Sequence, residues 1–450
     1  MTKRPDASWS ENQMRAYIAS AADNLFVEAG AGAGKTTRLS CRILHQLLSG
    51  EPAAHFLVIT YTKEAADELR VKIEKQLKRR IAAADAAERP ALIHLLEEVP
   101  FLFISTFAFF SRHVLESSGI ADAAGTDATE ETLARRLTEV PELLSSLRRR
   151  FTHIYVDEFQ DTDDIQKDII WRIACDENGR LRDNALFVIG DSLQAIYRPG
   201  REKIDSFHAF REKMEKSGNA SVLSLRDNFR SGPQIVSWVN EHFRPLVPGY
   251  RDMRSAQDSS SQRSFPLCGM FSSMQANPAL LIAGLIEKFP SLTPQNFMIV
   301  AKDGASADRC RQDLQTCGIP CLQTSREHEE NDGDVQLLDV CSAKSLNRDI
   351  VIIPACLKRP DKEKGKVIFF SAARDLLFPE QKSADQSLRT RREYVAATRA
   401  KHAVIFIPDM VQSGDSFWFD NDCYHWSSLP EPPVTEITSG LTQEPRRAIQ

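Results

Sequence analysis

The sequence predicts an α/β protein built on parallel β-sheets. Four short apolar runs, at 25–27, 56–60, 153–156 and 186–189, have the length and composition of strands buried on both faces. Segments with helical spacing of apolar residues separate these runs, an alternation typical of a doubly wound sheet. Each run ends on a polar cluster. Because binding sites in such sheets lie at the carboxyl ends of the strands, we expect the functional residues at that edge.

The composition is that of an ordinary soluble globular protein. The chain has 450 residues, 42% hydrophobic and 26% charged, which allows about two to four domains. The net charge of −5 gives no general attraction to nucleic acid, so a basic binding surface would have to be local. The nine cysteines lack the paired spacing of a zinc site. The start of the chain has no apolar signal segment and no apolar run is long enough to span a bilayer, so we expect a cytoplasmic protein without a membrane partner.

The strand at 25–27 is followed by a loop of small residues and then by a helix that stops at 49–50. The loop comprises Ala29, Gly30, Ala31, Gly32, Ala33 and Gly34, and it leads into Lys35, Thr36 and Thr37. Small residues let backbone N–H groups converge on phosphate oxygens, and the helix N-terminus adds partial positive charge. Lys35 can reach the β- and γ-phosphates, and the Thr36 hydroxyl can ligate Mg²⁺. A flexible loop before a Lys-Thr pair is the alternative, but the strand–loop–helix order favours a nucleotide site.

A pair of carboxylates, Asp157 and Glu158, follows the strand at 153–156. A carboxylate at a strand end beside a phosphate loop can hold Mg²⁺, as ATP hydrolysis requires. The adjacent Glu158 can then orient or deprotonate the attacking water. Solvated surface carboxylates are the alternative reading.

The helix expected at 63–80 carries a local basic run that includes Lys72. Its acidic neighbours balance the charge, so a solvated helix face and a binding surface are both open.

A second α/β series begins after a Pro-, Ser-, Gln- and Asp-rich stretch at 244–266. Its expected strands lie at 297–300, 335–340, 350–353 and 404–407. We therefore predict a first domain at 1–218, a second at 219–427, and a disordered tail at 428–450 whose composition is rich in Pro, Thr and Glu.

The order of these motifs resembles the UvrD/Rep/PcrA branch of superfamily 1 DNA helicases over roughly residues 9–407. In that family the phosphate loop commonly begins with Ala, as here. The resemblance implies two tandem RecA-like P-loop domains with parallel sheets, with ATP and Mg²⁺ between them. It also implies that Gln13 reads the adenine and that Phe229 stacks on it. Arg230 and Arg399 would meet the γ-phosphate, a role for which a guanidinium is well suited.

The resemblance extends to the remaining site residues. Gln160 and Gln194 would sense the γ-phosphate. Single-stranded DNA would cross the tops of both domains, stacking on Tyr197 and on Phe107 or Phe109. The full set of expected DNA contacts is Thr60, Tyr61, Thr62, Thr106, Phe107, Tyr197, Ser342 and Lys344.

Several positions depart from the family pattern. The aromatic platform expected after Tyr197 is replaced by 198–201, which reads Arg-Pro-Gly-Arg, and the usual His after Phe107 is Ala108. The segment 340–347 lacks the usual Gly and Glu. Two large accessory subdomains of processive relatives would fall between Thr106 and Asp157 and just before 335, and on length we expect both to be absent or vestigial. Residues expected to contact ATP are therefore better kept than those expected to contact DNA.

A compact form of this kind resembles the helicase-like subunit of the Gabija anti-phage defence system, which works beside a nuclease of the overcoming-lysogenization type. Three functions remain open on the sequence: a motor that translocates on or unwinds DNA, an ATPase that senses DNA ends and licenses a nuclease, and a structural or regulatory subunit with little or no turnover. The intact carboxylates and arginines disfavour the third, and the missing inserts modestly favour the second over the first.

Overall fold

The structure is a computed structural model that describes residues 17–18, 23–119, 129–196, 202–257, 265–272, 277–301, 304–322, 333–354, 384–407 and 427–428. The chain divides into two compact units, Met1–Phe229 and Arg230–Gln450. Two residues of the predicted site, Gln13 and Tyr197, lie outside the described residues.

The first unit is organised around a six-stranded sheet in which every pairing is parallel. The strands are β1 (Asn24–Ala29), β2 (Phe56–Thr60), β3 (Phe103–Thr106), β4 (His153–Val156), β5 (Leu186–Gly190) and β6 (Ala220–Leu225), in the order β3-β2-β4-β5-β1-β6. The strand β7 (Asp227–Asn228) follows β6 in the chain. The apolar runs seen in the sequence are thus neighbouring strands, and their carboxyl ends lie at one edge.

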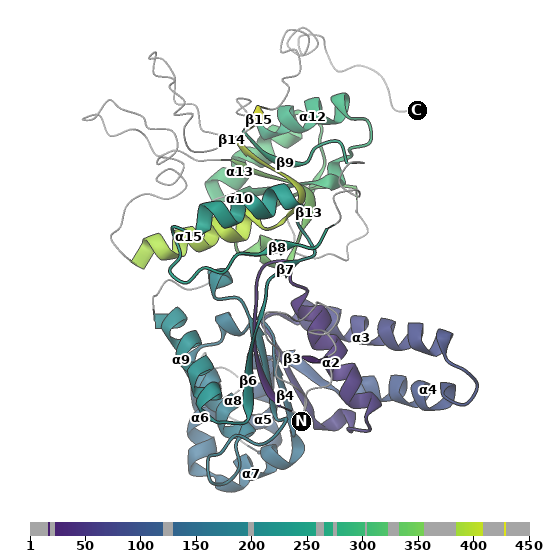
Figure 1. Ribbon diagram of the computed structural model, residues 1–450, viewed down its shortest axis with the longest axis vertical. Coiled ribbons are helices and arrows are strands. Elements are labelled where there is room, and N and C mark those ends of the chain that lie inside the picture. Colours follow the sequence, from purple (N-terminus) through teal and green to yellow (C-terminus); the bar gives the residue numbers. More distant parts are fainter. Residues whose placement is uncertain are drawn as a thin grey trace. The chain divides into compact units, whose positions relative to one another are not determined.

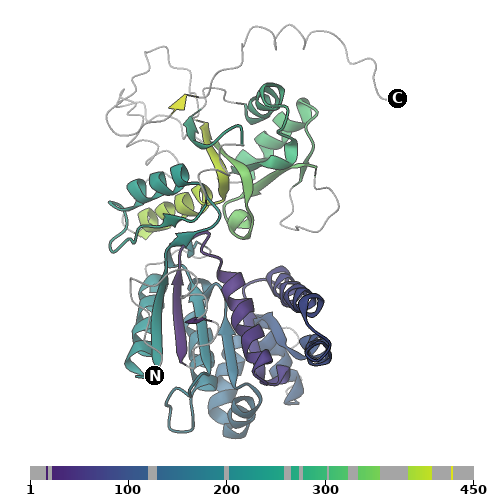
Figure 2. The same ribbon diagram turned by 45° about the vertical axis from the view of Figure 1, so that its right-hand side comes forward.

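Helices cover both faces of this sheet (Figures 1 and 2). One face is covered by α2 (Lys35–Leu48) and α3 (Lys63–Ala83), with α4 (Arg89–Glu98) packed against α3. The other is covered by α5 (Phe107–Ser117), α6 (Thr129–Glu139), α7 (Pro141–Arg150), α8 (Asp164–Ala174) and α9 (Glu202–Lys216). Successive residues of a strand serve opposite faces: Phe26 packs toward α8 and α9, whereas Leu25 and Val27 pack toward α2.

The segment between β3 and β4, where one accessory subdomain would fall, is occupied by α5, α6 and α7. Phe110, Leu133 and Leu147 from these three helices are buried in the same core as β4 and β5. The described part of this segment therefore belongs to the first unit.

The second unit has a seven-stranded sheet whose pairings are also all parallel. Its strands are β9 (Gly269–Ser272), β10 (Phe297–Ala301), β11 (Cys321–Leu322), β12 (Val335–Asp339), β13 (Arg348–Pro354), β14 (Ala400–Ile407) and β15 (Ser427–Ser428), in the order β11-β12-β10-β13-β14-β9-β15. The other elements are β8 (Arg254–Ser255), α10 (Pro233–Phe243), α12 (Pro278–Lys288), α13 (Gly304–Thr316) and α15 (Ala384–Ala397). The strands expected from the sequence in this half are β10, β12, β13 and β14.

The strand β6 was not expected from the sequence, because it mixes small and polar residues with only three large apolar ones. It pairs with β1 along its whole length, from Asn24↔Ala220 to Ala29↔Leu225. A boundary after residue 218 would cut this strand from its sheet, whereas the two compact units divide after Phe229.

Asn24, at the start of β1, joins three strands at their amino ends. Its side chain is fully buried and donates to the carbonyl oxygens of Arg182 at 2.9 Å and Asn219 at 3.2 Å. Its Oδ1 accepts from the backbone N–H groups of Ala185 at 2.9 Å and Leu186 at 2.7 Å. One amide therefore satisfies backbone groups at the start of β5 and just before β5 and β6, among them the buried N–H groups of Ala185 and Leu186.

We expect Asn24→Ala to lower the free energy of unfolding by about 2–4 kcal/mol, because it leaves several buried backbone groups without hydrogen bonds. Chemical denaturation followed by circular dichroism would measure the change. Asn178→Ala, at an exposed turn position, is the matched control and should change stability by less than about 0.5 kcal/mol. Equal losses in the two variants would contradict the role assigned to Asn24.

Candidate functional site

The loop between β1 and α2 has the backbone conformation of a phosphate cradle. Gly32 and Gly34 have left-handed φ angles of 70° and 73°, which a residue with a side chain adopts only at a cost. Gly34 is the N-cap of α2, so the first free N–H groups of that helix face the loop. The loop is anchored near its start and in its middle, because Gly30 N–H donates to Leu225 O at 3.2 Å and Phe229 N–H donates to Gly32 O at 2.9 Å.

Lys35, the first residue of α2, reaches across to the carboxylate that follows β4. Its Nζ lies 3.4 Å from Glu158 Oε1, and the two side chains are 11% and 28% exposed. Glu158 itself has a left-handed φ of 47°, which is uncommon for a residue with a side chain. Its N–H donates to Asp157 Oδ1 at 2.9 Å, and Asp157 is buried. The structure therefore brings Lys35, Asp157 and Glu158 together, as the strand order requires.

The end of β5 supplies a second polar group to this site. Asp191 is buried and accepts from Leu193 N–H at 3.0 Å and from Gln194 Nε2 at 2.8 Å. Burial raises the pKa of the Asp191 carboxyl above its usual range, an effect that Lys35 opposes. Gln160 is 1% exposed and connects the two strand ends, because it donates to Glu158 and accepts from Asp191 N–H.

A lysine that the sequence motifs did not single out for the site contacts the phosphate loop. Lys72 of α3 donates from Nζ to Thr37 Oγ1 at 2.7 Å. Burial lowers the pKa of this lysine, and Asp157 and Glu68 oppose that shift. The basic run of the helix is therefore not uniform: Lys72 turns toward the loop, while Lys75 is exposed. The sequence signal that could have found it is its position beside Leu69 and Ile73, the buried stripe of α3.

The described residues of the first unit that are expected to contact DNA lie at the carboxyl ends of β2 and β3, which pair as Thr60↔Thr106. Tyr61 is 44% exposed, whereas Thr60 is buried and donates to Thr62 O at 2.9 Å. Thr62 and Thr106 are helix N-caps, accepting from Ala65 N–H at 3.1 Å and Phe109 N–H at 3.3 Å respectively.

Phe107 does not fit the stacking role expected for it. Its side chain is 5% exposed and packs edge-on against Phe110 in the core. Phe109, two residues later, is 57% exposed. The helical geometry of α5 explains the difference, because adjacent residues of a helix face different directions and Phe107 and Phe110 share the buried face.

The second unit gathers the two candidate arginines and Lys344. Arg230 Nη1 donates to Thr398 O at 3.1 Å. Arg399 is 1% exposed and donates to Val395 O at 2.9 Å, to Thr398 Oγ1 at 3.1 Å and to Lys344 O. Nearby, Ser342 N–H donates to Asp339 Oδ1 at 2.7 Å, at the carboxyl end of β12.

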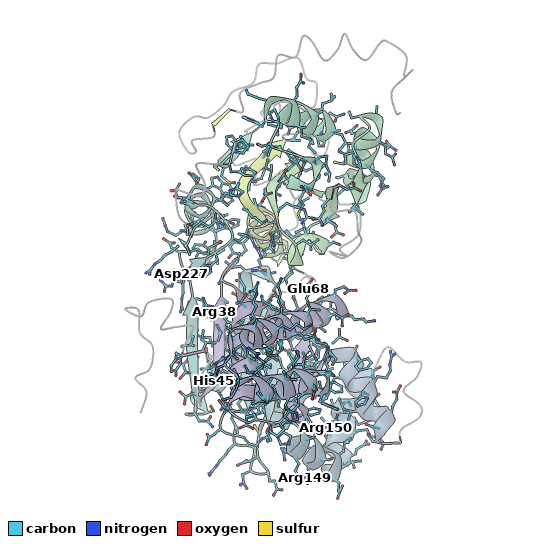
Figure 3. The ribbon with its side chains drawn as sticks, turned by 90° about the vertical axis from the view of Figure 1, so that its right-hand side faces the viewer. Arg38, His45, Glu68, Arg149, Arg150 and Asp227 are labelled. Carbon is cyan, nitrogen blue, oxygen red and sulfur yellow. The ribbon has the colours of Figure 1, made fainter. Side chains whose placement is uncertain are left out.

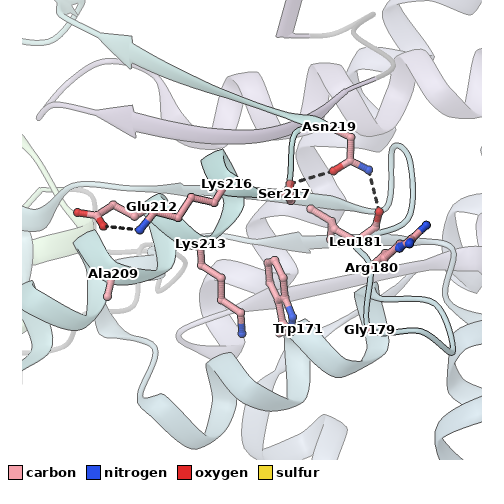
Figure 4. Close-up of a pocket in the computed structure, with 10 residues that line it drawn as sticks. All are labelled: Trp171, Gly179, Arg180, Leu181, Ala209, Glu212, Lys213, Lys216, Ser217 and Asn219. Atoms are coloured by element: carbon pink, nitrogen blue, oxygen red, sulfur yellow. Dashed lines mark hydrogen bonds and ion pairs between the residues drawn. The ribbon is translucent and has the colours of Figure 1, made fainter.

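Two other basic surfaces of the first unit lie away from the carboxyl ends of its strands. Arg149 and Arg150 stand at the end of α7, just before β4 begins (Figure 3). An open pocket between α8 and α9 is lined by Trp171, Arg180, Lys213 and Lys216 (Figure 4). Its residues Leu181 and Asn219 precede β5 and β6. Both surfaces are therefore at the amino ends of the strands, opposite the candidate site.

No helix among the described residues is long and apolar enough to cross a membrane. Within the same residues, no group of three His, Cys, Asp or Glu side chains is arranged to hold a metal ion by protein ligands alone.

Comparison with known proteins agrees with this geometry. Residues 9–124 and 116–215 match the UvrD/REP helicase N-terminal domain. The chain is 26% identical over 281 residues to the ATP-dependent DNA helicase PcrA of Bacillus subtilis, covering 48% of this chain and 37% of that protein. It is 35% identical over 108 residues to an ATP-dependent helicase/nuclease subunit of Leuconostoc mesenteroides subsp. mesenteroides, covering 24% of this chain and 9% of that protein.

A further relative is an ATP-dependent helicase/nuclease subunit of Staphylococcus carnosus, 28% identical over 172 residues, or 36% of this chain and 13% of that protein. The chain thus spans well under half the length of these relatives. The region matched by the helicase domain contains the phosphate loop, both carboxylates and Gln194. Residues 9–215 of this chain therefore match a UvrD/REP helicase N-terminal domain.

Proposed function

We propose that this protein is a Mg²⁺-dependent ATPase of the UvrD-like helicase type whose turnover responds to DNA. The observation that carries the proposal is the ion pair between Lys35 of the phosphate loop and Glu158 at the end of β4. Lys35, the proposed phosphate-binding cation, and Glu158, the proposed general base, thus lie within 3.4 Å of each other at the carboxyl edge of a parallel sheet, which supports the proposal.

The residues present fit ATP and Mg²⁺. The backbone N–H groups of the loop from Ala29 to Gly34 and the Lys35 ammonium would hold the phosphates, with Thr37 at the first turn of α2. Thr36 and Asp157 would hold Mg²⁺, which usually takes only one or two protein ligands and completes its shell with phosphates and water. When bound, Mg²⁺ would neutralise charge on the phosphates. The adenine would rest near Phe229, whose backbone is tied to the loop through Gly32.

Glu158 is the residue we assign to water activation. One of its oxygens lies against Lys35 in this structure, so binding of phosphate to the Lys35 ammonium would release that oxygen toward a water molecule. Gln194 remains assigned to the γ-phosphate. Arg230 and Arg399 are assigned to charge stabilisation on the same phosphate, which a planar guanidinium does well.

DNA would run along the carboxyl edge of the first sheet. Tyr61 and Phe109 are exposed aromatic side chains there. We also assign base stacking to Tyr197, which lies outside the described residues. In the second unit Ser342 and Lys344 complete the proposed path. Hydrolysis would then serve to translocate on, unwind or sense DNA, in anti-phage defence or DNA repair and beside a nuclease. The names of the relatives support the nuclease context, since two of those named above are helicase/nuclease subunits.

A second candidate is a structural or regulatory DNA-binding subunit of a nuclease complex with weak or no hydrolysis. The burial of Arg399 favours it, because that guanidinium is already hydrogen-bonded within the second unit. The pairing of Lys35 with Glu158 favours the ATPase.

We expect Lys35→Ala to lower kcat for ATP hydrolysis by about 100- to 1000-fold, because it removes a charge aimed at the transferred phosphate. A phosphate-release assay with Mg²⁺ and single-stranded DNA would measure the loss. Lys75→Ala, at an exposed position of α3, controls for general loss of positive charge and should leave the rate unchanged. Undiminished hydrolysis in Lys35→Ala would show that the site is elsewhere.

We expect Phe109→Ala to weaken binding of single-stranded DNA by about 5- to 150-fold, because stacking of one base on an aromatic ring contributes about 1–3 kcal/mol. Fluorescence anisotropy with a labelled oligonucleotide would measure the affinity. Phe101 is a matched control, because it is 68% exposed and lies at the other end of β3. Similar losses in Phe101→Ala and Phe109→Ala would argue against a path along the carboxyl edge.

A further inference from the structure

Gln160 fills the space between the ends of β4 and β5. It belongs to the short 3₁₀ turn Phe159–Asp161 that directly follows Glu158, and its side chain is 1% exposed. Its Nε2 donates to Glu158 Oε2 and, at 3.5 Å, to Asp161 Oδ2. Its Oε1 accepts from Asp191 N–H at 2.8 Å. Both ends of the amide are therefore used by the protein itself.

The backbone decides which way this amide points. A peptide N–H can only donate, so the group facing Asp191 N–H must be the Gln160 oxygen. The NH₂ group then faces Glu158, whose carboxylate accepts. In this orientation both the oxygen and the nitrogen of the buried amide have hydrogen-bond partners, and in the flipped orientation neither would.

Gly190, the last residue of β5, makes this approach possible. A Cβ at position 190 would lie 2.6 Å from Gln160 Oε1 and 3.2 Å from the backbone nitrogens of Phe159 and Gln160. The first distance is too short for any side chain, so a residue other than glycine would displace the amide. The absence of a Cβ at position 190 thus leaves the space that the Gln160 amide occupies beside Glu158.

Glu158 is held from two sides as a result. Lys35 Nζ forms an ion pair with its Oε1, and Gln160 Nε2 donates a hydrogen bond to its Oε2. Its backbone is also in the left-handed region, so the side chain leaves the chain at an unusual angle that the surrounding contacts must maintain. When phosphate draws Lys35 away, the Gln160 amide still holds Oε2 of this carboxylate.

We propose that Gln160 is a positioning residue that holds the Glu158 carboxylate in place for water activation, instead of contacting the γ-phosphate. This inference rests on the proposed ATPase function and replaces the γ-phosphate role expected for Gln160. We keep the assignment of the γ-phosphate contact to Gln194, whose Nε2 donates a hydrogen bond to Asp191 Oδ2.

Gln160→Glu tests the proposal, because it keeps the size of the side chain and an oxygen for Asp191 N–H but removes the donor to Glu158. We expect kcat for ATP hydrolysis to fall about 10- to 100-fold, as for a misplaced catalytic group, with KM changed less than about threefold. Affinities for ADP and for a non-hydrolysable ATP analogue, measured by fluorescence, should keep their wild-type ratio. Gln315→Glu makes the same chemical change at an exposed position of α13 and should match wild type in every measurement.

Gly190→Ala tests the same contact from the other strand. We expect it to lower kcat to a similar extent, because the added methyl group displaces the Gln160 amide. In a Gln160→Ala background the added methyl group no longer meets Oε1 at 2.6 Å, and only the backbone nitrogens at 3.2 Å remain close to it. The double variant should therefore lose little beyond Gln160→Ala alone. Nucleotide affinity and thermal unfolding of each variant show that the fold persists.

The outcomes separate this proposal from the ATPase assignment. A Gln160→Glu protein that loses its preference for the ATP analogue over ADP would place Gln160 on the γ-phosphate and overturn the proposal. Multiplicative effects of Gly190→Ala and Gln160→Ala would also overturn it. If the wild-type protein hydrolyses ATP and Gln160→Glu has the same kcat, the positioning role of Gln160 is refuted and the ATPase assignment stands. If the wild-type protein does not hydrolyse ATP, the positioning role and the ATPase assignment are both refuted.

Discussion

The parallel pairing of β1, β5 and β4 is the constraint on which the assigned chemistry depends. These three strands run side by side in the first sheet, so the phosphate loop after β1, Asp191 after β5 and the carboxylates after β4 emerge at one edge. The distance of 3.4 Å between Lys35 and Glu158 follows from that register. A shift of one strand by a residue would turn these side chains to the wrong face of the sheet.

Within that frame, backbone conformations unusual for most residues are concentrated at the site. Gly32 and Gly34 have left-handed φ angles in the loop, Glu158 has one after β4, and Gly190 allows β5 to approach Gln160. Each of these features costs conformational freedom or adds strain, which the buried core on both faces of the sheet sustains. Asn24 performs the complementary task at the amino edge, where it satisfies backbone groups before β5 and β6.

Much of the first unit could be predicted from the sequence. Apolar runs of four or five residues indicated β2, β4 and β5, and the loop from Ala29 to Gly34 indicated a nucleotide site because its residue types serve local backbone geometry. Local sequence patterns were less informative where tertiary packing determines whether a segment is a strand or whether a side chain is buried. The strand β6 carries a weak apolar signal and is defined by its pairing with β1. Phe107 and Phe109 differ only in which side of α5 meets the core.

The contacts that connect the site were the least predictable. Lys72 reaches Thr37 over 35 residues of sequence, and Gln160 reaches Asp191 over 31. Neither partner could be identified without knowing that α3 lies on α2 and that β5 lies beside β4. The order of the motifs nevertheless indicated the family whose N-terminal domain the comparisons match, because the motif residues are the polar groups at the ends of the strands.

The central claim is that this site hydrolyses ATP in response to DNA. The most direct measurement is phosphate release from Mg-ATP by the full chain without DNA, with single strands, with linear duplex and with closed circular duplex. Glu158→Gln, which keeps the size of the side chain and removes the carboxylate, serves as the blank. We expect turnover in the wild-type protein that DNA raises and that is lost in Glu158→Gln. Turnover that is equal in wild type and Glu158→Gln, or no turnover under any of the four conditions, would contradict it.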